Sequence, residues 1–457
     1  MGNSQRLIET QAVVVGAGTA GSYIAWKLSE AGFGCVVLEK ERLDSLGTSI
    51  GPFHMEESAF GEFGLPLPQG DELLHTIDRM TMWSPSRDRS HSFSFPTLVM
   101  DKPLFTRRLH RYARQAGAEI IEGARVDSLM RELGVLRGVS AETAQGRVAV
   151  RGEVVIDASG IESEVRTRMP ESPWFENDPI SPSDTIFVYM ETWSDIDGDM
   201  GAGVNTYPDM LGWYAPGPGE TTIVGVGAGG GFEAARRRHR EMVATLPFRG
   251  RVLGSAMGRV PYRRPPMSLV DNGLMVVGDA ACMNKPFSGE GVTSGFTGCS
   301  ITVDVAAGAI AGSDATREAL WSYNARYFRD QGAKFAMLLS VLPAAAGMRP
   351  EEMDYLFDVP GLLTEEGSLA MQRDFELGGG RGQAIEALPG ILGGMLSGRL
   401  GASSLLKLAV AALNGWALRR LYERYPEHPF DFPAWKRKAI PLWKRADRAR
   451  YRYFAKA

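Results

Sequence analysis

The sequence predicts an α/β fold: a Rossmann-like nucleotide-binding domain with an inserted antiparallel-sheet domain, followed by C-terminal helices. Three observations predict it. Short, fully apolar runs alternate with helical patterns and indicate buried strands at both ends of the range 12–311. Residues 180–255 differ and show the pattern of an open sheet with loops between its strands. From Arg317 onward the pattern is helical.

The composition is that of a globular protein and excludes several functions. The 457 residues are 44% hydrophobic and 23% charged, which suits two or three domains and neither a disordered nor a fibrous chain. A net charge of −4 argues against nucleic acid as a partner. Cys35, Cys282 and Cys299 lack a CxxC spacing and the six histidines are scattered, so we expect no disulfide framework and no metal site. Without an apolar signal core or a membrane-spanning run, a cytoplasmic location is expected.

The first predicted unit is a βαβ element. Ala12–Val15 is an apolar run that predicts a buried strand, a helix is expected over 20–31, and a second strand over Cys35–Leu38 ends at Glu39. Residues 41–100 look rich in loops because Gly, Pro, Phe and His are frequent there.

The remaining elements alternate in type. Helices are expected at 104–116, 236–245 and from about Gly289 to 311, and strands at 118–121, 146–150, 153–156, 185–192, 212–215, 221–226 and 274–277. The predicted domains are a discontinuous nucleotide-binding domain (8–85, 98–165 and 255–330), a substrate-binding sheet (175–255 with part of 60–100) and a helical region (331–457).

The strongest motif is GxGxxG at Gly16–Gly21, between a predicted strand and a predicted helix. Gly16 permits the sharp turn, Gly18 lets the backbone approach a pyrophosphate, and Gly21 lets helix and strand pack closely. The helix N-terminus offers free N–H groups to phosphate. Glu39 can accept both ribose hydroxyls and would repel a 2′-phosphate, so the motif predicts FAD or NAD rather than NADP. The other candidates around this motif are Thr19, Ala20, Lys40 and Val126.

A second GxGxxG match occurs at 225–230. No buried strand with a terminal acidic residue follows the helix after it. We therefore interpret this match as a sheet strand that ends in a turn, not as an NADPH loop.

A second candidate motif lies in residues 271–299. Asp279 follows a buried strand and could accept hydrogen bonds from a polyol chain. Pro286–Gly291 forms a loop before a helix, whose N-terminus would stabilise negative charge on a reduced flavin. Gly289 and Gly291 would let the ring lie on the backbone.

These motifs occur together with further stretches that are typical of one family. They are VMDKPLFTRRLHRYARQAGAEII at 99–121, VVIDASG at 154–160, GDAA and PFSGEG within 278–291, GEFGLP at 61–66, and LGWYAPGP at 211–218, which keeps Trp213 and Pro216 of a YxWxFP motif. Over roughly residues 10–330 the chain resembles the geranylgeranyl reductase family, within the flavoproteins of the p-hydroxybenzoate hydroxylase fold.

The resemblance implies an α+β two-domain flavoprotein that binds FAD through the glycine loop, Glu39 and Asp279, with Gly291 and Val292 at the flavin ring. Lys102 stands where the family usually has an arginine near FAD. The resemblance also implies reduction of isolated C=C bonds in isoprenoid lipid chains, with ferredoxin, a quinol or NADPH as electron donor. The chain departs from the family at Leu46–Gly51, where the Cys-Gly motif of many members is absent. This difference leaves the exact substrate open.

The expected chemistry is hydride delivery from N5 of reduced FAD to one alkene carbon and proton delivery to the other. An unactivated alkene has no carbonyl to polarise, so orientation in a dry apolar pocket matters more than a strong acid. Candidate proton donors are His54, Tyr207, Tyr214 and water, and Trp213 could line the pocket. Cys282 is expected to be a small buried residue.

Two other functions stay open. One is a flavin-dependent monooxygenase or halogenase of the same fold, although Leu211 and Ala215 replace two residues of the WxWxIP stretch expected in halogenases. The other is a non-catalytic binding module, against which Glu39 and the GDAA…GEG loop argue.

The C-terminal third suggests a relation to lipid. Residues 334–348 and 386–418 are rich in Leu, Ala, Met and Gly and could cap a lipid pocket, dock on a membrane, or pack on the core. The tail 431–457 holds nine Lys/Arg and two acidic residues among aromatic residues. This pattern fits a peripheral site on an anionic membrane or a solvated helix face.

Overall fold

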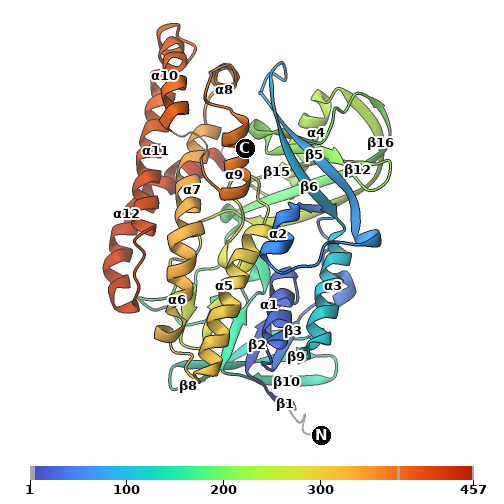
Figure 1. The fold of residues 1–457 in the computed structure, drawn as a ribbon, viewed down its shortest axis with the longest axis vertical. Helices are drawn as coiled ribbons and strands as arrows, with labels where there is room; N and C mark the ends of the chain where they lie inside the picture. Colours follow the sequence, from blue (N-terminus) through green and yellow to red (C-terminus); the bar gives the residue numbers. More distant parts are fainter. Residues whose placement is uncertain (1–5, 378–380, 455–457) are drawn as a thin grey trace.

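Three β-sheets organise the protein, and the computed structural model describes residues 6–377 and 381–454 (Figure 1). The central sheet has six strands, all parallel to their neighbours except β17. In spatial order they are β17 (Val270–Asp271), β18 (Leu274–Val276), β11 (Val154–Asp157), β2 (Ala12–Val15), β3 (Cys35–Glu39) and β7 (Glu119–Glu122). This arrangement confirms the predicted α/β class, because segments far apart in the chain build one parallel sheet.

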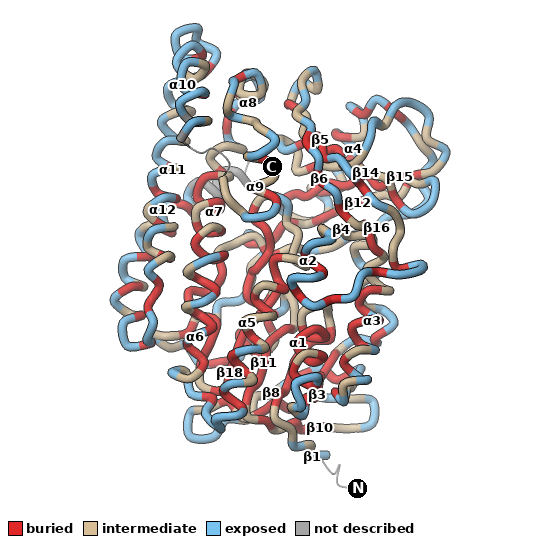
Figure 2. The backbone as a smooth tube through the Cα atoms, viewed as in Figure 1, coloured by how far each residue is buried: buried red, intermediate tan, exposed pale blue. Residues whose placement is uncertain are grey.

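The central sheet is covered by helices and by a second sheet. The strands β2, β3, β11 and β18 are buried throughout, which explains why they are continuous apolar runs. Helices α1 (Thr19–Glu30), α3 (Lys102–Gln115) and α5 (Val292–Ala311) lie side by side across it (Figure 1). Figure 2 shows the buried residues concentrated in this layer. A four-stranded sheet packs on β3 and β11; in spatial order it holds β1 (Arg6–Glu9), β10 (Gly146–Arg151), β9 (Val135–Thr143) and β8 (Arg125–Glu132).

Helix α5 is the one helix, among the described residues, that is long and apolar enough to cross a membrane. Of its 18-residue apolar window, 61% is buried inside the protein. It packs between α1 and α6 (Arg317–Tyr327), as a core helix does.

The third sheet has eight mostly antiparallel strands. In spatial order they are β16 (Phe248–Pro261), β12 (Thr185–Gly198), β15 (Thr222–Ala228), β14 (Gly212–Pro216), β13 (Val204–Tyr207), β5 (Leu73–Trp83), β6 (Ser90–Met100) and β4 (Phe53–Met55). Helix α4 (Phe232–Thr245) packs on β12 and β15. The short helix α2 (Glu57–Glu62) follows β4.

The expectation that residues 41–100 are loop-rich is wrong, because two 11-residue strands, β5 and β6, lie there. Residues of β6 alternate between exposed and buried along SHSFSFPT, so the period of two is present but is hidden among polar residues. Strands β1, β8, β9, β13 and β16 were also not predicted. β16 is largely exposed, so it offers little apolar pattern to detect.

The C-terminal region is helical, as predicted. Its helices are α6, α7 (Ala333–Ala346), α8 (Pro350–Phe357), α9 (Glu365–Asp374), α10 (Arg381–Leu396), α11 (Ala402–Tyr422) and α12 (Phe432–Phe454). Helices α7, α11 and α12 pack on one another. Trp435 and Trp443 of the basic tail are buried and contact Tyr422. These two aromatic residues therefore form core instead of a membrane-facing surface. Phe432 of the tail is buried as well, whereas the aromatic side chains of residues 451, 453 and 454, and Lys456, lie outside what the structure describes.

Candidate cofactor and active site

The three glycines of the first motif have different surroundings. Gly16 has φ +101°, and a Cβ there would lie 2.4 Å from the Ala158 carbonyl oxygen. A Cβ at Gly21 would lie 1.9 Å from the Gly16 carbonyl oxygen. The protein itself therefore requires these two glycines. At Gly18 a Cβ would meet nothing within 4 Å, so the N-terminus of α1 is bordered by open space. That space suits a phosphate group bound to the free N–H groups of the helix.

Glu39 closes the motif at the end of β3. Its Oε2 accepts the Ala17 N–H at 2.7 Å and its Oε1 accepts the Glu41 N–H at 2.9 Å. The residue is 5% exposed, and its carboxylate borders a pocket of about 210 Å³. Five predicted cofactor residues share this pocket: Gly16, Gly18, Glu39, Lys40 and Val126. The pocket lies at the carboxyl ends of β2 and β3, where parallel sheets bind nucleotides.

The second motif builds a tight loop before α5, Pro286–Gly291, which we call the flavin loop. The Asn284 side-chain amide donates to Asp279 Oδ1 at 3.0 Å. A Cβ at Gly291 would lie 2.5 Å from that amide nitrogen, so a larger residue there would displace the Asn284 side chain from Asp279. Gly289 has φ +76° and Pro286 is buried. Helix α5 then begins at Val292 without a side-chain cap, which leaves N–H groups for a ligand.

Lys102 lies at the start of α3 with its ammonium close to Asp279. Burial lowers the pKa of Lys102, and the Asp279 carboxylate opposes this. Burial likewise raises the pKa of Asp279. Lys102 is half-buried. A cation beside Asp279 fits an anionic group of a bound cofactor, and the two glycine-bordered helix ends fit the same ligand.

His54 meets the flavin loop through a carboxylate that the sequence did not single out. His54 Nε2 lies 3.0 Å from Glu290 Oε1, and Lys285 Nζ lies 2.9 Å from Glu290 Oε2. Burial alone would raise the pKa of Glu290, but His54 and Lys285 hold it well below its usual range. The only sequence signal for this group is that Lys285 precedes the flavin loop and Glu290 lies within it. His54 reaches them because β4 pairs with β6 at the end of the large sheet.

Trp213 and Tyr214 lie on opposite faces of the large sheet. Tyr214 packs against Tyr207 and Phe248 on the face covered by α4, and burial raises the pKa of both tyrosines. Trp213 lies on the other face, where its ring leaves no room for a Cβ at Gly225. The structure therefore does not bring Tyr207 and Tyr214 to the flavin loop.

The face that holds Trp213 also contacts the flavin loop. A Cβ at Gly289 would lie 3.5 Å from Val260 Cγ1, and Val260 pairs with Ile186 on this face. Because side chains alternate between the two faces of a strand, the neighbours of Ile186 and Val260 on this face are uncharged. We call this the apolar sheet face; its members include Ile186, Val188, Met190, Trp213, Ile223 and Val260.

The second GxGxxG match is part of strand β15, as the sequence predicted. A Cβ at Gly225 would lie 2.4 Å from the Trp213 ring, and one at Gly227 would lie 2.7 Å from Ile186 Cγ2. These glycines therefore make room for side chains of the apolar sheet face.

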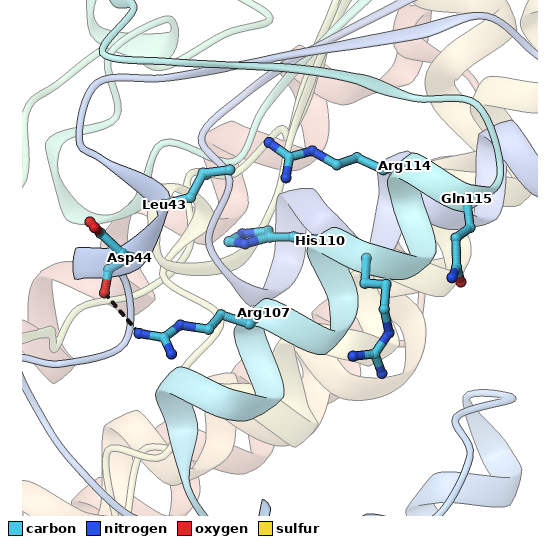
Figure 3. A pocket seen from close by; sticks show the side chains of 7 residues that line it. Leu43, Asp44, Arg107, His110, Arg114 and Gln115 are labelled. Carbon is cyan, nitrogen blue, oxygen red and sulfur yellow. Dashed lines mark hydrogen bonds between the residues drawn. The ribbon is translucent and has the colours of Figure 1, made fainter.

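A basic pocket of about 360 Å³ lies on the outer side of α3 (Figure 3). Its lining is Leu43, Asp44, Arg107, His110, Arg111, Arg114 and Gln115. His110 is buried, and its Nε2–H donates to the Ala17 carbonyl at 2.8 Å. Burial lowers the pKa of His110, which favours its neutral form. His110 therefore supports the glycine loop from behind, and none of the predicted site residues lies in this pocket.

Comparisons with known proteins match both motifs. A family model described as FAD dependent oxidoreductase matches residues 62–367, and one described as NAD(P)-binding Rossmann-like domain matches residues 14–66. A digeranylgeranylglycerophospholipid reductase of Sulfolobus acidocaldarius is 24% identical over 93% of this chain and 95% of its own length. The protein of the same name from Methanoculleus marisnigri is 28% identical over 69% of this chain and 81% of its own.

Solved structures share the fold. A geranylgeranyl bacteriochlorophyll reductase-like protein of Thermoplasma acidophilum has a TM-score of 0.70 at 20% identity, over 77% of this chain and 91% of that one. The myxobacterial chondrochloren halogenase has a TM-score of 0.58 at 16% identity, over 91% and 97%. At these identities the two structures support the two-domain architecture alone.

Proposed function

The chain belongs to the FAD dependent oxidoreductase family, and from this premise we propose that it reduces C=C bonds of an isoprenoid lipid chain. This membership confirms FAD as the predicted cofactor. The named relatives confirm the predicted resemblance to geranylgeranyl reductases. The observation that carries the proposal is the apolar sheet face, which contacts the flavin loop and whose six named members are all apolar. Relatives named digeranylgeranylglycerophospholipid reductase support the same substrate class.

One set of residues would bind the cofactor, and a different set would bind the substrate. The glycine loop and Glu39 would bind the ADP part of FAD, Asp279 its polyol chain, and the start of α5 its ring. When bound in its reduced form, FAD supplies a hydride. Free N–H groups at the start of α5 stabilise negative charge there.

The apolar sheet face would hold the alkene against the flavin loop. An isolated double bond offers no polar handle, so rate acceleration depends on fixed orientation and exclusion of water. Trp213 supplies a large flat surface for this, and Gly225 lets its ring lie on the strand.

We assign the proton to His54. His54 Nε2 lies 3.0 Å from the Glu290 carboxylate, which Lys285 also contacts, so the imidazole is held beside the flavin loop. His54 would then deliver that proton to the second alkene carbon, or to a water that reaches it.

Two further partners belong to the proposal. Reduction of FAD requires an electron donor, for which ferredoxin, a quinol and NADPH are the candidate classes. A lipid substrate also requires access to a membrane, and we propose that the protein associates peripherally with one.

The proposal is tested by product analysis. FAD-loaded protein with a chemical reductant is incubated without oxygen with a phospholipid that carries geranylgeranyl chains, and the lipid is examined by mass spectrometry. We expect a gain of two hydrogens for each double bond reduced. Consumption of oxygen with no change in the lipid would favour the monooxygenase or halogenase alternative.

A further inference from the structure

Helix α10 exposes an apolar stripe. The stripe consists of exposed apolar residues that lie one to four positions apart in the sequence: Ile385, Leu388, Leu392, Met395 and Leu396. Leu396 is 90% exposed. No charged residue occurs between Glu386 and Arg399. A stripe of this kind on a soluble surface marks a binding face, because monomeric proteins rarely expose contiguous apolar residues.

Helix α11 continues the pattern after a short connection. Leu406, Val410, Leu413 and Trp416 are exposed at spacings of three or four, with Leu413 at 70%. All nine tryptophans lie in the described residues, and only Trp416 is exposed. The Arg420 guanidinium lies 5.3 Å from the centre of its ring. A tryptophan beside an arginine suits the boundary between acyl chains and headgroups.

The charge of this surface favours a phospholipid partner over a second copy of the chain. Residues 387–422 contain Arg399, Lys407, Arg419 and Arg420 and no acidic residue. Arg419 and Arg420 are ion-paired with Glu376 and Glu423, so Arg399 and Lys407 are the cations that this surface offers to a partner. A second copy of the chain docked through the same face would bring these cations together, which disfavours a two-fold interface. Anionic phospholipid headgroups complement them.

The hairpin of α10 and α11 is fixed to the rest of the protein. The Tyr355 hydroxyl donates to the Gly390 carbonyl at 2.7 Å. The buried Glu352 accepts the Gly401 N–H and the Ser404 hydroxyl, each at 2.8 Å. Figure 1 shows the two helices along the outer edge of the molecule, and Figure 2 shows α10 mostly exposed and α11 exposed on one side only. The apolar stripes are thus displayed by a preformed element.

The hairpin follows the helix that contacts the large sheet. Ser368 of α9 lies 3.0 Å from His91 of β6, and Leu369 packs with Met80 and Phe93. The element that precedes the hairpin is therefore in contact with the sheet that would hold the substrate.

We propose that the α10–α11 hairpin inserts its apolar stripes into the interface of an anionic lipid bilayer and so brings the active site to its lipid substrate. The choice of a lipid partner rests on the proposed function, but binding is measured separately from reduction. The buried tryptophans of α12 exclude the tail's aromatic residues 435 and 443 from this role.

The test uses the FAD-loaded full chain and sedimentation with phosphatidylcholine vesicles, with or without phosphatidylglycerol. We expect binding to the anionic vesicles and an at least tenfold loss of partitioning in Leu396→Glu/Leu413→Glu. The matched control is Leu133→Glu, since Leu133 is a fully exposed leucine in the turn between β8 and β9; it should bind as the wild type does. Arg399→Gln/Lys407→Gln should bind anionic vesicles no better than neutral ones.

Equal FAD content and thermal unfolding of the variants show that each is folded. The proposal is overturned if the wild-type protein does not sediment with anionic vesicles. It is also overturned if the double glutamate variant binds them as well as the wild type does. A wild-type dimer that the double variant dissociates, without vesicle binding, overturns it in favour of a subunit interface. Reduction of a short prenyl alcohol in solution reports on the proposed function alone, and the double variant should retain that rate.

Discussion

Gly16, Gly18 and Gly21 look alike in the sequence but have different physical roles. A Cβ at Gly16 or Gly21 would collide with backbone, whereas a Cβ at Gly18 would enter open space. The first and last glycines therefore serve the fold, and the middle one serves the ligand. The sequence motif predicts all three positions, but only the surroundings separate the roles.

Gly18→Ala should fold normally and lose cofactor. Its φ of −65° suits alanine, and the free volume accepts the methyl group, so the thermal unfolding of the FAD-free protein should not change. Because the methyl group occupies the approach to the helix N-terminus, the Kd for FAD should rise at least tenfold, about 1.4 kcal/mol. Fluorescence titration with FAD measures this. Gly21→Ala is the contrasting variant and should lose several kcal/mol of stability; equal FAD affinity in Gly18→Ala and wild type would contradict the assigned role.

His54→Gln should lower the rate of alkene reduction and leave FAD affinity nearly unchanged, because His54 would supply the proton. Glu290→Gln removes the carboxylate that lies 3.0 Å from His54 Nε2 and should lower the same rate by a smaller factor. Single-turnover reoxidation of reduced enzyme by a prenyl substrate measures both effects. Full activity in both variants rules out this proton path.

At the scale of elements, the sequence predicted best where a strand is buried on both sides. The strands β2, β3, β11 and β18 were located because buried parallel strands are continuous apolar runs. Strand β16 was missed because it is largely exposed. The contact of His54 with Glu290 could not be predicted, since 236 residues of sequence separate positions that only the sheet topology joins.

Strand β15 shows that a motif takes its meaning from the element that contains it. Gly225 matches a phosphate-loop pattern, but its missing side chain accommodates Trp213. Gly225→Ala should destabilise the protein by about 1–3 kcal/mol through overpacking and should displace the Trp213 ring.

Thermal unfolding and tryptophan emission measure the two effects. Gly254→Ala is the control in the same sheet, because a Cβ there meets nothing within 4 Å. If both variants unfold alike, the packing argument fails.

Glu352 makes the base of the hairpin sensitive to acid. Burial alone would raise its pKa, but hydrogen bonds from Arg349, Gly401 and Ser404 lower it from 4.5 to about 2. A carboxylate whose pKa is lowered by folding stabilises the protein above the unfolded pKa and loses that effect as pH falls through the folded one. The contribution, at most roughly 3 kcal/mol, should be complete above pH 4.5 and should vanish toward pH 2.

Glu352→Gln should therefore differ most from wild type at neutral pH and least near pH 2. Hydrogen exchange of residues 385–405, followed from pH 7 downward, resolves this locally. A difference between the two proteins that is independent of pH would show that the carboxylate charge is not what anchors the hairpin.

At the scale of the whole molecule, the fold places three different surfaces around one reaction. The parallel sheet presents the nucleotide site, the apolar sheet face borders the flavin loop, and the hairpin displays exposed apolar stripes. The sequence predicted the first in detail because short motifs encode it. It predicted the others only as apolar composition, because the direction in which a helix or strand faces depends on packing across the molecule.

The central claim is that this flavoprotein transfers a hydride to an isoprenoid double bond. The most direct measurement is anaerobic photoreduction of the FAD-loaded protein, followed by rapid mixing with a geranylgeranyl phospholipid while flavin absorbance is recorded. We predict reoxidation of the flavin at a rate that rises with lipid concentration, together with formation of hydrogenated lipid. A flavin that stays reduced with every prenyl lipid and is reoxidised only when oxygen is admitted would contradict the account.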